Sequence, residues 1–273
     1  MNVGQVGFRS WRSAQDEMGG ADPAESDDPV CRDGRDILAP VLFRQEAGDK
    51  EAVDLGDVTQ GHLDDCFFLA PLAAMAMTDQ GRAFIRSSIA DNYGPDGAVH
   101  SYTVTLRRPV PDSSPMSNEV KVVVSASDFG CNHARARVDE PTGDHEIWPL
   151  VYESAYLQVM GGVANVERNR GGDVASAMLA LTGRVPTENR FKGSEGKIEN
   201  ALQGQELVVV GTESTAVAPL LPAHAYVVTS IDRSGHETRI SLHNPHNKDG
   251  SNITMTYAQL SRYASSVFIG SLP

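Results

Sequence analysis

Cysteine is scarce in this sequence: Cys31, Cys66 and Cys131 are the only three in 273 residues. Their wide, unpatterned spacing excludes a disulfide framework and favours a reducing intracellular compartment, with export as an effector as the alternative. Long apolar runs are also absent, since none approaches the ~18 residues of a transmembrane helix. The amino-terminal MNVGQVGFRSWRSAQ lacks the apolar region of a cleavable secretory signal. We therefore expect no membrane span.

Basic residues are too few to balance the acidic ones. The 23 Lys and Arg residues stand against 36 Asp and Glu residues, which gives a net charge of −13. This charge opposes binding to phosphate backbones and to anionic membrane surfaces, so we expect no nucleic-acid partner. The hydrophobic content of 40% is enough for one domain or two small lobes, and we expect a monomer.

Apolar periodicity is weak over residues 1–56, where Gly, Asp, Glu, Ser and Pro are frequent. The run ILAPVLF at 37–43 is the exception. These features predict a flexible polar leader that contains one loosely packed segment.

Residues 57–172 predict a mainly helical lobe with one β-hairpin. The stretch from 66 to 90 has helical composition, and EIWPLVYESAYLQVMGG (146–162) gathers apolar residues on one helical face before a Gly-Gly stop. Between them, SYTVTLRR and EVKVVVSAS alternate along their length and are separated by the turn-forming PDSSPMSN, which predicts the hairpin.

Residues 173–273 predict a β-rich lobe. Asp173 begins a short helix that Gly183 ends, and after about residue 205 the sequence consists of short strands at regular intervals. The whole chain therefore predicts an α+β fold with two lobes, of which the second is built on a small antiparallel sheet or barrel.

Cys66 lies in the segment GHLDDCFFLAPLAAMAM, behind two aspartates and directly before an apolar run. Asp64 or Asp65 is a natural N-cap for the following helix, because its carboxylate can accept hydrogen bonds from the first turn. The thiol would then lie at the positive end of the helix dipole, which favours the thiolate. The alternative is a small buried apolar residue that happens to contain sulfur.

His224 is the histidine best placed to act on such a thiol. It opens the strand HAYVVTSID directly after LLPA, where a side chain can face a cleft. Asn244 ends the next strand, so an antiparallel pair would place the two residues side by side and let the Asn oxygen orient the imidazole. The alternative is that the Asn-Pro dipeptide only begins a turn.

Gln60 precedes Cys66 by six residues. Its side-chain amide and the backbone N–H of Cys66 could together donate to the oxyanion that forms during acyl transfer to a thiolate. The alternative is that TQG is an ordinary loop.

Five segments, in the right order, resemble motifs of the calpain family of cysteine proteases. QGHLDDCFFLAPLA is similar to the family's Q-G-x-L-G-D-C-W, and EIWPLVYESAYLQVMGG is similar to its E-x-W-P-x-L-x-E-K-A-Y helix. GGDVASAMLALTGR resembles its Gly-Gly substrate strip, AHAYVVTSID its G-H-A-Y-x-V, and HNPH its R-N-P-W. The resemblance runs from about Gln60 to the C-terminus. It implies a papain-like, two-lobed fold with the Cys on the helical lobe and the His and Asn on the antiparallel β lobe.

The same resemblance implies a cysteine endopeptidase that cleaves a protein or peptide substrate through a thioester acyl-enzyme. Cys66 would be the nucleophile, His224 its acid–base partner, Asn244 the residue that orients His224, and Gln60 an oxyanion donor. Substrate backbone would bind along three further residues that the resemblance implies, Gly171, Gly172 and Ala223.

Several positions depart from the family's motifs, although none of them removes a reacting atom. Asp64 replaces a glycine, Phe67 a tryptophan, and Ala223 the glycine before the histidine, while Pro71 enters the active-site helix. His246 stands in place of the tryptophan after Asn-Pro. We expect Asp64 to point away from the cleft, because its charge would oppose ionisation of the thiol.

Calpains hold calcium in acidic loops of both lobes. Here the loop before His224, TESTAVAPLLPA, contains a single acidic residue, Glu213. We therefore expect no cofactor, with calcium as the less favoured alternative. Two other functions stay open: acyl transfer to an amine, as in transglutaminases, and a degenerate protease that serves as a binding module.

Overall fold

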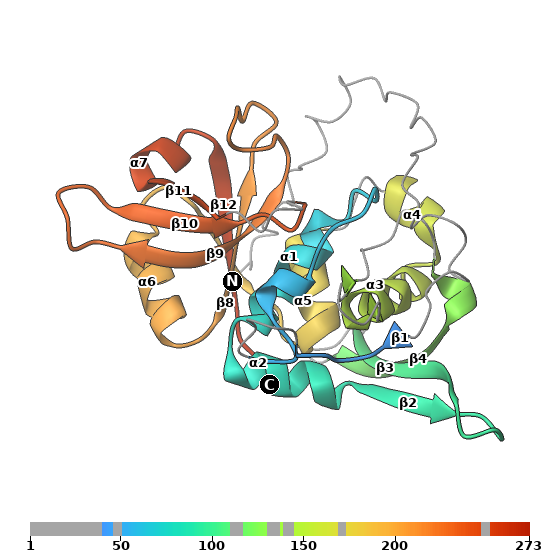
Figure 1. Cartoon of the computed structure of the whole chain (residues 1–273). Coiled ribbons are helices and arrows are strands. Elements are labelled where there is room, and N and C mark those ends of the chain that lie inside the picture. Colours follow the sequence, from blue (N-terminus) through green and yellow to red (C-terminus); the bar gives the residue numbers. More distant parts are fainter. Residues whose placement is uncertain are drawn as a thin grey trace, which may run out of the picture.

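The protein is described here by a computed structural model, which covers residues 40–45, 51–109, 117–129, 137–138, 145–168, 173–246 and 252–273. Most of the predicted leader lies outside the described residues, as do Cys31, Cys131, Gly171 and Gly172. Within them, the helices and the two larger, antiparallel sheets form a mixed α+β arrangement, as predicted (Figure 1).

Residues 40–182 hold most of the helices, and we call this part the helical side. Its predicted hairpin is confirmed as β3 (Val99–Pro109) and β4 (Ser117–Ser125), to which β2 (Ile89–Tyr93) adds a third antiparallel strand. A smaller sheet joins β1 (Pro40–Val41), β6 (His145–Glu146) and β5 (Arg137–Val138). The helices are η3 (Leu55–Asp57), α1 (Cys66–Ala76), α2 (Asp79–Ser87), η4 (Ala126–Asp128), α3 (Trp148–Val159), α4 (Val163–Arg168) and α5 (Val174–Thr182).

The helical stretch expected from 66 to 90 is two helices, because Thr78 interrupts it. Thr78 has an extended backbone, and its hydroxyl accepts a hydrogen bond from the Gly81 N–H at 3.0 Å, so it caps the start of α2. Among the described residues, no helix is both long and apolar enough to cross a lipid bilayer.

Residues 187–273 form a six-stranded antiparallel sheet with two helices, which we call the sheet side. Its strand order is β11, β10, β9, β8, β12, β7. The strands are β7 (Thr187–Arg190), β8 (Leu207–Thr212), β9 (Ala225–Asp232), β10 (Arg239–His243), β11 (Ile253–Thr256) and β12 (Ala264–Gly270), and the helices are α6 (Glu195–Gln203) and α7 (Tyr257–Leu260).

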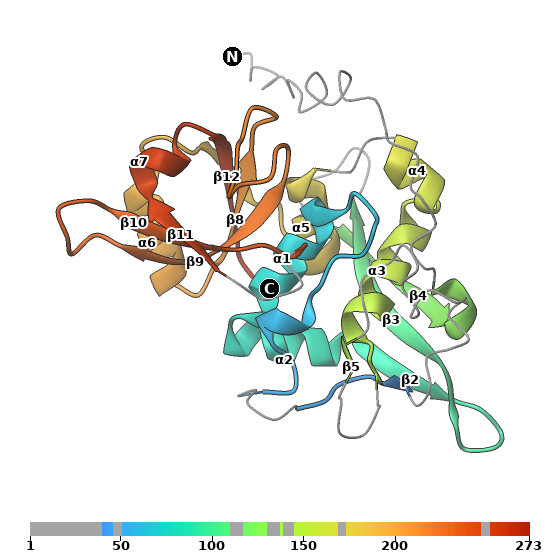
Figure 2. The same ribbon diagram turned by 45° about the horizontal axis from the view of Figure 1, so that its top comes forward.

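Helix α1 lies between the two sides and is buried along its whole length. All eleven of its residues are buried, including Pro71, and its sequence is apolar in every direction. It packs against α5 within the helical side and against β8 and β9 of the sheet side, and both views show it in this central place (Figures 1 and 2). A helix without a polar face needs cover on every side, and the two sides supply it together.

Two clusters of buried apolar residues make up the core. The first fills the helical side and takes in the faces of β8 and β9 that cover α1, while the second lies on the other face of the same sheet. Helix α5 belongs to the first cluster. The predicted lobe boundary at residue 172 stays a prediction, and the packing of α5 favours a later boundary, after Gly183.

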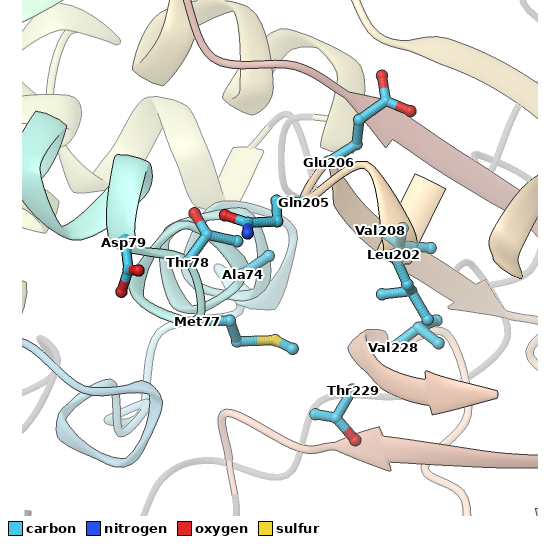
Figure 3. A pocket seen from close by; sticks show the side chains of 10 residues that line it. All are labelled: Ala74, Met77, Thr78, Asp79, Leu202, Gln205, Glu206, Val208, Val228 and Thr229. Atoms are coloured by element: carbon cyan, nitrogen blue, oxygen red, sulfur yellow. The ribbon is translucent and has the colours of Figure 1, made fainter. Parts of the chain in front are cut away.

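A pocket of about 270 Å³ lies at the end of α1 that is opposite Cys66 (Figure 3). Its lining comes from both sides of the molecule: the α1–α2 junction, the turn between α6 and β8, and strands β8 and β9. Gln205 in that turn has a φ of 56°, a left-handed conformation in which glycine is more usual. The contact between the two sides is therefore hollow at this end.

The segment that leads to Gln60 is anchored to α3 by a buried carboxylate. Asp57 is 2% exposed, and its Oδ2 accepts from the Trp148 indole N–H at 3.1 Å and from the Asp54 N–H at 2.6 Å. Asp54 returns a bond to the first turn of η3, which completes a capping box. Asp57 thus fixes η3 against the start of α3.

We expect Asp57→Ala to lower the free energy of unfolding by about 2–4 kcal/mol, because it leaves the buried Trp148 indole N–H without an acceptor. Asp57→Asn is the matched control, since its remaining oxygen can accept the same bonds, and it should cost about 1 kcal/mol. Urea unfolding measures both. Equal losses in the two variants would contradict the role given to the carboxylate.

Candidate active site

Cys66 is the first residue of α1 and is 8% exposed. Asp65 occupies the N-cap position, as predicted, but the expected side-chain cap is wrong, because its carboxyl makes no capping hydrogen bond. Its backbone carbonyl instead accepts from the N–H groups of Phe68 at 2.8 Å and Leu69 at 3.1 Å. Asp64 is exposed, as expected.

The Asp65 side chain is buried close to a second buried acid. It is fully buried and its carboxyl interacts with that of Glu153 on α3, which is also fully buried. Burial raises the pKa of Asp65 to about 7, since a carboxylate is poorly solvated there. No sequence pattern indicates this pair, because the two residues are far apart and acids are seldom buried.

His224 is held at the entrance of β9 by its backbone. The His224 N–H donates to the Thr212 hydroxyl oxygen at 3.0 Å, and the Thr212 N–H donates to the His224 carbonyl at 2.9 Å. The Thr212 hydroxyl also donates to the Leu221 carbonyl at 2.7 Å, and the Ala223 N–H to the Glu213 carbonyl at 3.1 Å. These bonds close the base of the loop between β8 and β9.

Ala223 has a φ of 48°, which is left-handed. This conformation costs a residue with a side chain roughly 1 kcal/mol relative to glycine. It explains in physical terms why a glycine would suit the position before the histidine.

The structure brings His224 and Asn244 together, as the sequence predicted. His224 Nε2 and Asn244 Oδ1 are 2.7 Å apart, because His224 directly precedes β9 and Asn244 directly follows the neighbouring antiparallel strand β10. The His246 backbone N–H also donates to Asn244 Oδ1, at 3.0 Å, so this atom must be the oxygen of the amide. An oxygen there accepts from Nε2, which makes Nε2 the protonated nitrogen and leaves Nδ1 as the basic one.

The Cys66 thiol lies beside the residue that follows His224. The Ala225 backbone N–H is close enough to the thiol sulfur to lower the pKa of Cys66. Helix α1 packs on β9, and this contact sets the first residue of the helix against the first residue of the strand. The sequence could not reveal the Ala225 contact, because any residue carries a backbone N–H.

Burial favours the neutral forms of both Cys66 and His224. It raises the pKa of the Cys66 thiol to about 12, a shift that the Ala225 N–H opposes and the charges of Asp65 and Asp64 increase. Burial lowers the pKa of His224 to about 4, against the hydrogen bond with Asn244 and with the help of the His246 charge. Desolvation thus opposes the thiolate that the position of Cys66 at the helix N-terminus favours.

Gln60 lies where the helical side meets Asn244. It is 5% exposed, and its backbone N–H donates to the Pro245 carbonyl at 2.7 Å. Its side-chain Nε2 donates to the Leu63 carbonyl at 2.5 Å, which uses one of the two hydrogens on that nitrogen. Three separated segments, residues 60–66, 224 and 244, thus contribute the site, and its four predicted catalytic residues all lie near the contact between the two sides.

Comparison with known proteins agrees with this geometry. A sequence model described as "Calpain family cysteine protease" matches residues 43–252, more than three-quarters of the chain. The chain belongs to the calpain family of cysteine proteases. Among its relatives, calpain-13 of Rattus norvegicus is 26% identical over 204 residues, which cover 69% of this chain and 29% of that protein. Calpain-9 of Homo sapiens is 26% identical over 195 residues, 65% of this chain and 26% of that protein.

The calpain-family chain spans less than a third of the length of these relatives.

Metal-binding side chains are dispersed in the described part of this calpain-family domain. Within those residues, no group of three or more His, Cys, Asp or Glu side chains is arranged to hold a metal ion. Gly171 and Gly172, expected to bind substrate backbone, lie outside the described residues, so their role stays a prediction.

His246, where calpains have a tryptophan, stands beside the candidate base. Its ring centre is 6.4 Å from that of His224, and the two rings are nearly perpendicular. Its positive charge, when present, lowers the pKa of His224, because two cations repel each other.

We expect His246→Trp to raise the pKa of His224, since the substitution removes the neighbouring charge and keeps an aromatic ring. NMR titration of the His224 ring measures it, and His236→Trp on the exposed turn between β9 and β10 is the matched control. An unchanged or lower pKa of His224 in His246→Trp would contradict the repulsion.

Proposed function

We propose that this calpain-family domain is an endopeptidase that cleaves peptide bonds through a thioester on Cys66. The observation that carries the proposal is the hydrogen bond of His224 Nε2 to Asn244 Oδ1. It leaves Nδ1 as the basic nitrogen, at the strand end where the Cys66 thiol meets the Ala225 N–H.

In the proposed reaction, the Cys66 proton moves to His224 Nδ1 while the sulfur attacks the scissile carbonyl. The neutral states that burial favours in both residues support such a transfer during attack, rather than an ion pair held beforehand. His224 then gives the proton to the leaving amine as the C–N bond breaks. Water, deprotonated by the same imidazole, hydrolyses the thioester, which restores the thiol and releases the acid.

The carbonyl oxygen gains negative charge during attack. The Gln60 amide and the Cys66 backbone N–H are the donors proposed for it. The second hydrogen on Gln60 Nε2 would serve, since the first is engaged by the Leu63 carbonyl. The substrate backbone would bind along three further residues, Ala223, Gly171 and Gly172.

A binding module with weak catalysis is the second candidate, and one observation favours it. The thiol is 8% exposed and its pKa is raised to about 12, so the nucleophile is both covered and weakly acidic. Turnover measurements separate the two candidates, because a module that only binds would hold a peptide without cleaving it.

Cys66→Ala should abolish cleavage of a fluorogenic peptide and leave the thermal midpoint within a few degrees, because the change is small and removes only the nucleophile. Cys31→Ala and Cys131→Ala are matched controls that should keep full activity. A thiol-directed peptidyl epoxide should modify Cys66 in the intact protein, as located by mass spectrometry. Activity that survives in Cys66→Ala would overturn the assignment.

Gln60→Ala should lower kcat by about 10²- to 10³-fold with a smaller effect on KM, which is the usual result of removing one oxyanion donor. Gln80→Ala, at an exposed glutamine of α2, is the control and should leave kcat and KM unchanged. Steady-state kinetics on one peptide measure both variants. A normal kcat in Gln60→Ala would contradict the oxyanion role and leave Gln60 as an ordinary loop residue.

A further inference from the structure

His243 is a buried histidine that the proposed reaction does not use. It ends β10, is 4% exposed, and lies directly opposite Val227 of β9. Residues opposite each other in an antiparallel pair share a face of the sheet. Val227 belongs to the cluster shared with the helical side, whereas Leu242 belongs to the other cluster. The imidazole of His243 therefore faces the helical side.

Few groups on that face can stabilise a charge on His243. Asp54 of the helical side is the charged residue that acts on it, while β9 presents the apolar Val227. The buried Nε2 of His243 has no hydrogen-bond partner among the described residues. Burial lowers the pKa of His243 to about 4, and the attraction of Asp54 offsets this only in part.

Asn244 is held against the helical side from both directions along the chain. His243, just before it, faces Asp54, and Pro245, just after it, accepts a hydrogen bond from the Gln60 N–H at 2.7 Å. Asp54 and Gln60 belong to one short segment of the helical side. The residue that orients His224 and the proposed oxyanion donor are thus joined through a single contact between the two sides.

We propose that His243 is a positioning residue whose neutral imidazole keeps Asn244 and Gln60 in register across this contact. Protonation of His243 places a poorly compensated charge in the contact, so acid separates segment 54–60 from residues 243–245. The catalytic consequence rests on the proposed function, whereas the separation itself can be measured without catalysis.

The Gln60 amide hydrogen reports this separation directly, because its hydrogen bond crosses the contact. A contact that lowers the pKa of a histidine is stabilised by the neutral imidazole at pH values above the ordinary histidine pKa, and this stabilisation is lost as the pH falls below that value. We call the contact closed when segment 54–60 lies against residues 243–245. A shift from 6.5 to about 4 makes closure about 30-fold less favoured at pH 5 than at pH 7.5.

Hydrogen exchange of the Gln60 amide, measured by NMR at pH 7.5 and pH 5, tests the proposal. The protection factor should fall about 30-fold more in the wild type than in His243→Gln, which cannot be protonated. His224 is present in both proteins, so its own contribution cancels. If His243→Gln does not fold, His243→Leu serves in its place, with the same expected result.

His236→Gln is the matched control, because His236 is exposed on the turn that joins β9 and β10, and it should behave as the wild type. Asp54→Asn removes the attraction that supports the charged imidazole and so lowers the pKa of His243 further when the contact is closed. Because His243 is then already almost wholly neutral at pH 5, the loss of protection there should stay close to that of the wild type. Equal losses in the wild type and His243→Gln would overturn the proposal.

Peptide hydrolysis gives the catalytic consequence. The ratio of kcat/KM of His243→Gln to that of the wild type should be higher at pH 5 than at pH 7.5, chiefly through kcat. A wild type that cleaves no peptide would end the proposed function, and the exchange experiment would still decide the role of His243. Cleavage with a ratio that does not change with pH would count against His243 and leave the peptidase proposal standing.

Discussion

The burial of α1 on every side is the constraint on which the rest of the structure depends. An apolar helix of this kind is stable only inside a core, and neither side of the molecule encloses it alone. The two sides must therefore meet along α1, and its first residue, Cys66, lies at one edge of their contact. The position of the thiol is a consequence of how the helix is covered.

The same burial sets the electrostatics around the thiol. Removing water from Cys66, His224 and His243 favours their uncharged forms, which a dry contact between two apolar surfaces accepts at low cost. Burial acts in the same direction on Asp65, which shares a buried space with the acid Glu153. In this protein, protonation and the packing of the two sides are coupled.

The sequence predicted most of what depends on local pattern. The α+β class, the hairpin, the β-rich second half and the pairing of His224 with Asn244 all follow from periodicity, turn residues and strand order. It did not reveal contacts between distant residues: Asp65 is at the N-cap position, but its carboxyl makes no capping bond and is buried near Glu153 of α3. It also carried no information on the desolvation that raises the pKa of the Cys66 thiol, because desolvation is a property of the assembled core and of no single segment.

The loop between β8 and β9 is closed at its base by Thr212 and His224, whose backbones bond to each other, and by Ala223 bonded to Glu213. Because these bonds fix the position of the histidine, the residues between them do not determine it. Closing a longer loop costs only a few tenths of a kcal/mol for each modest extension. Insertions and exchanges at the exposed residues 217–219 are therefore a route by which evolution or protein engineering can reshape the surface next to His224 and leave His224 itself in place.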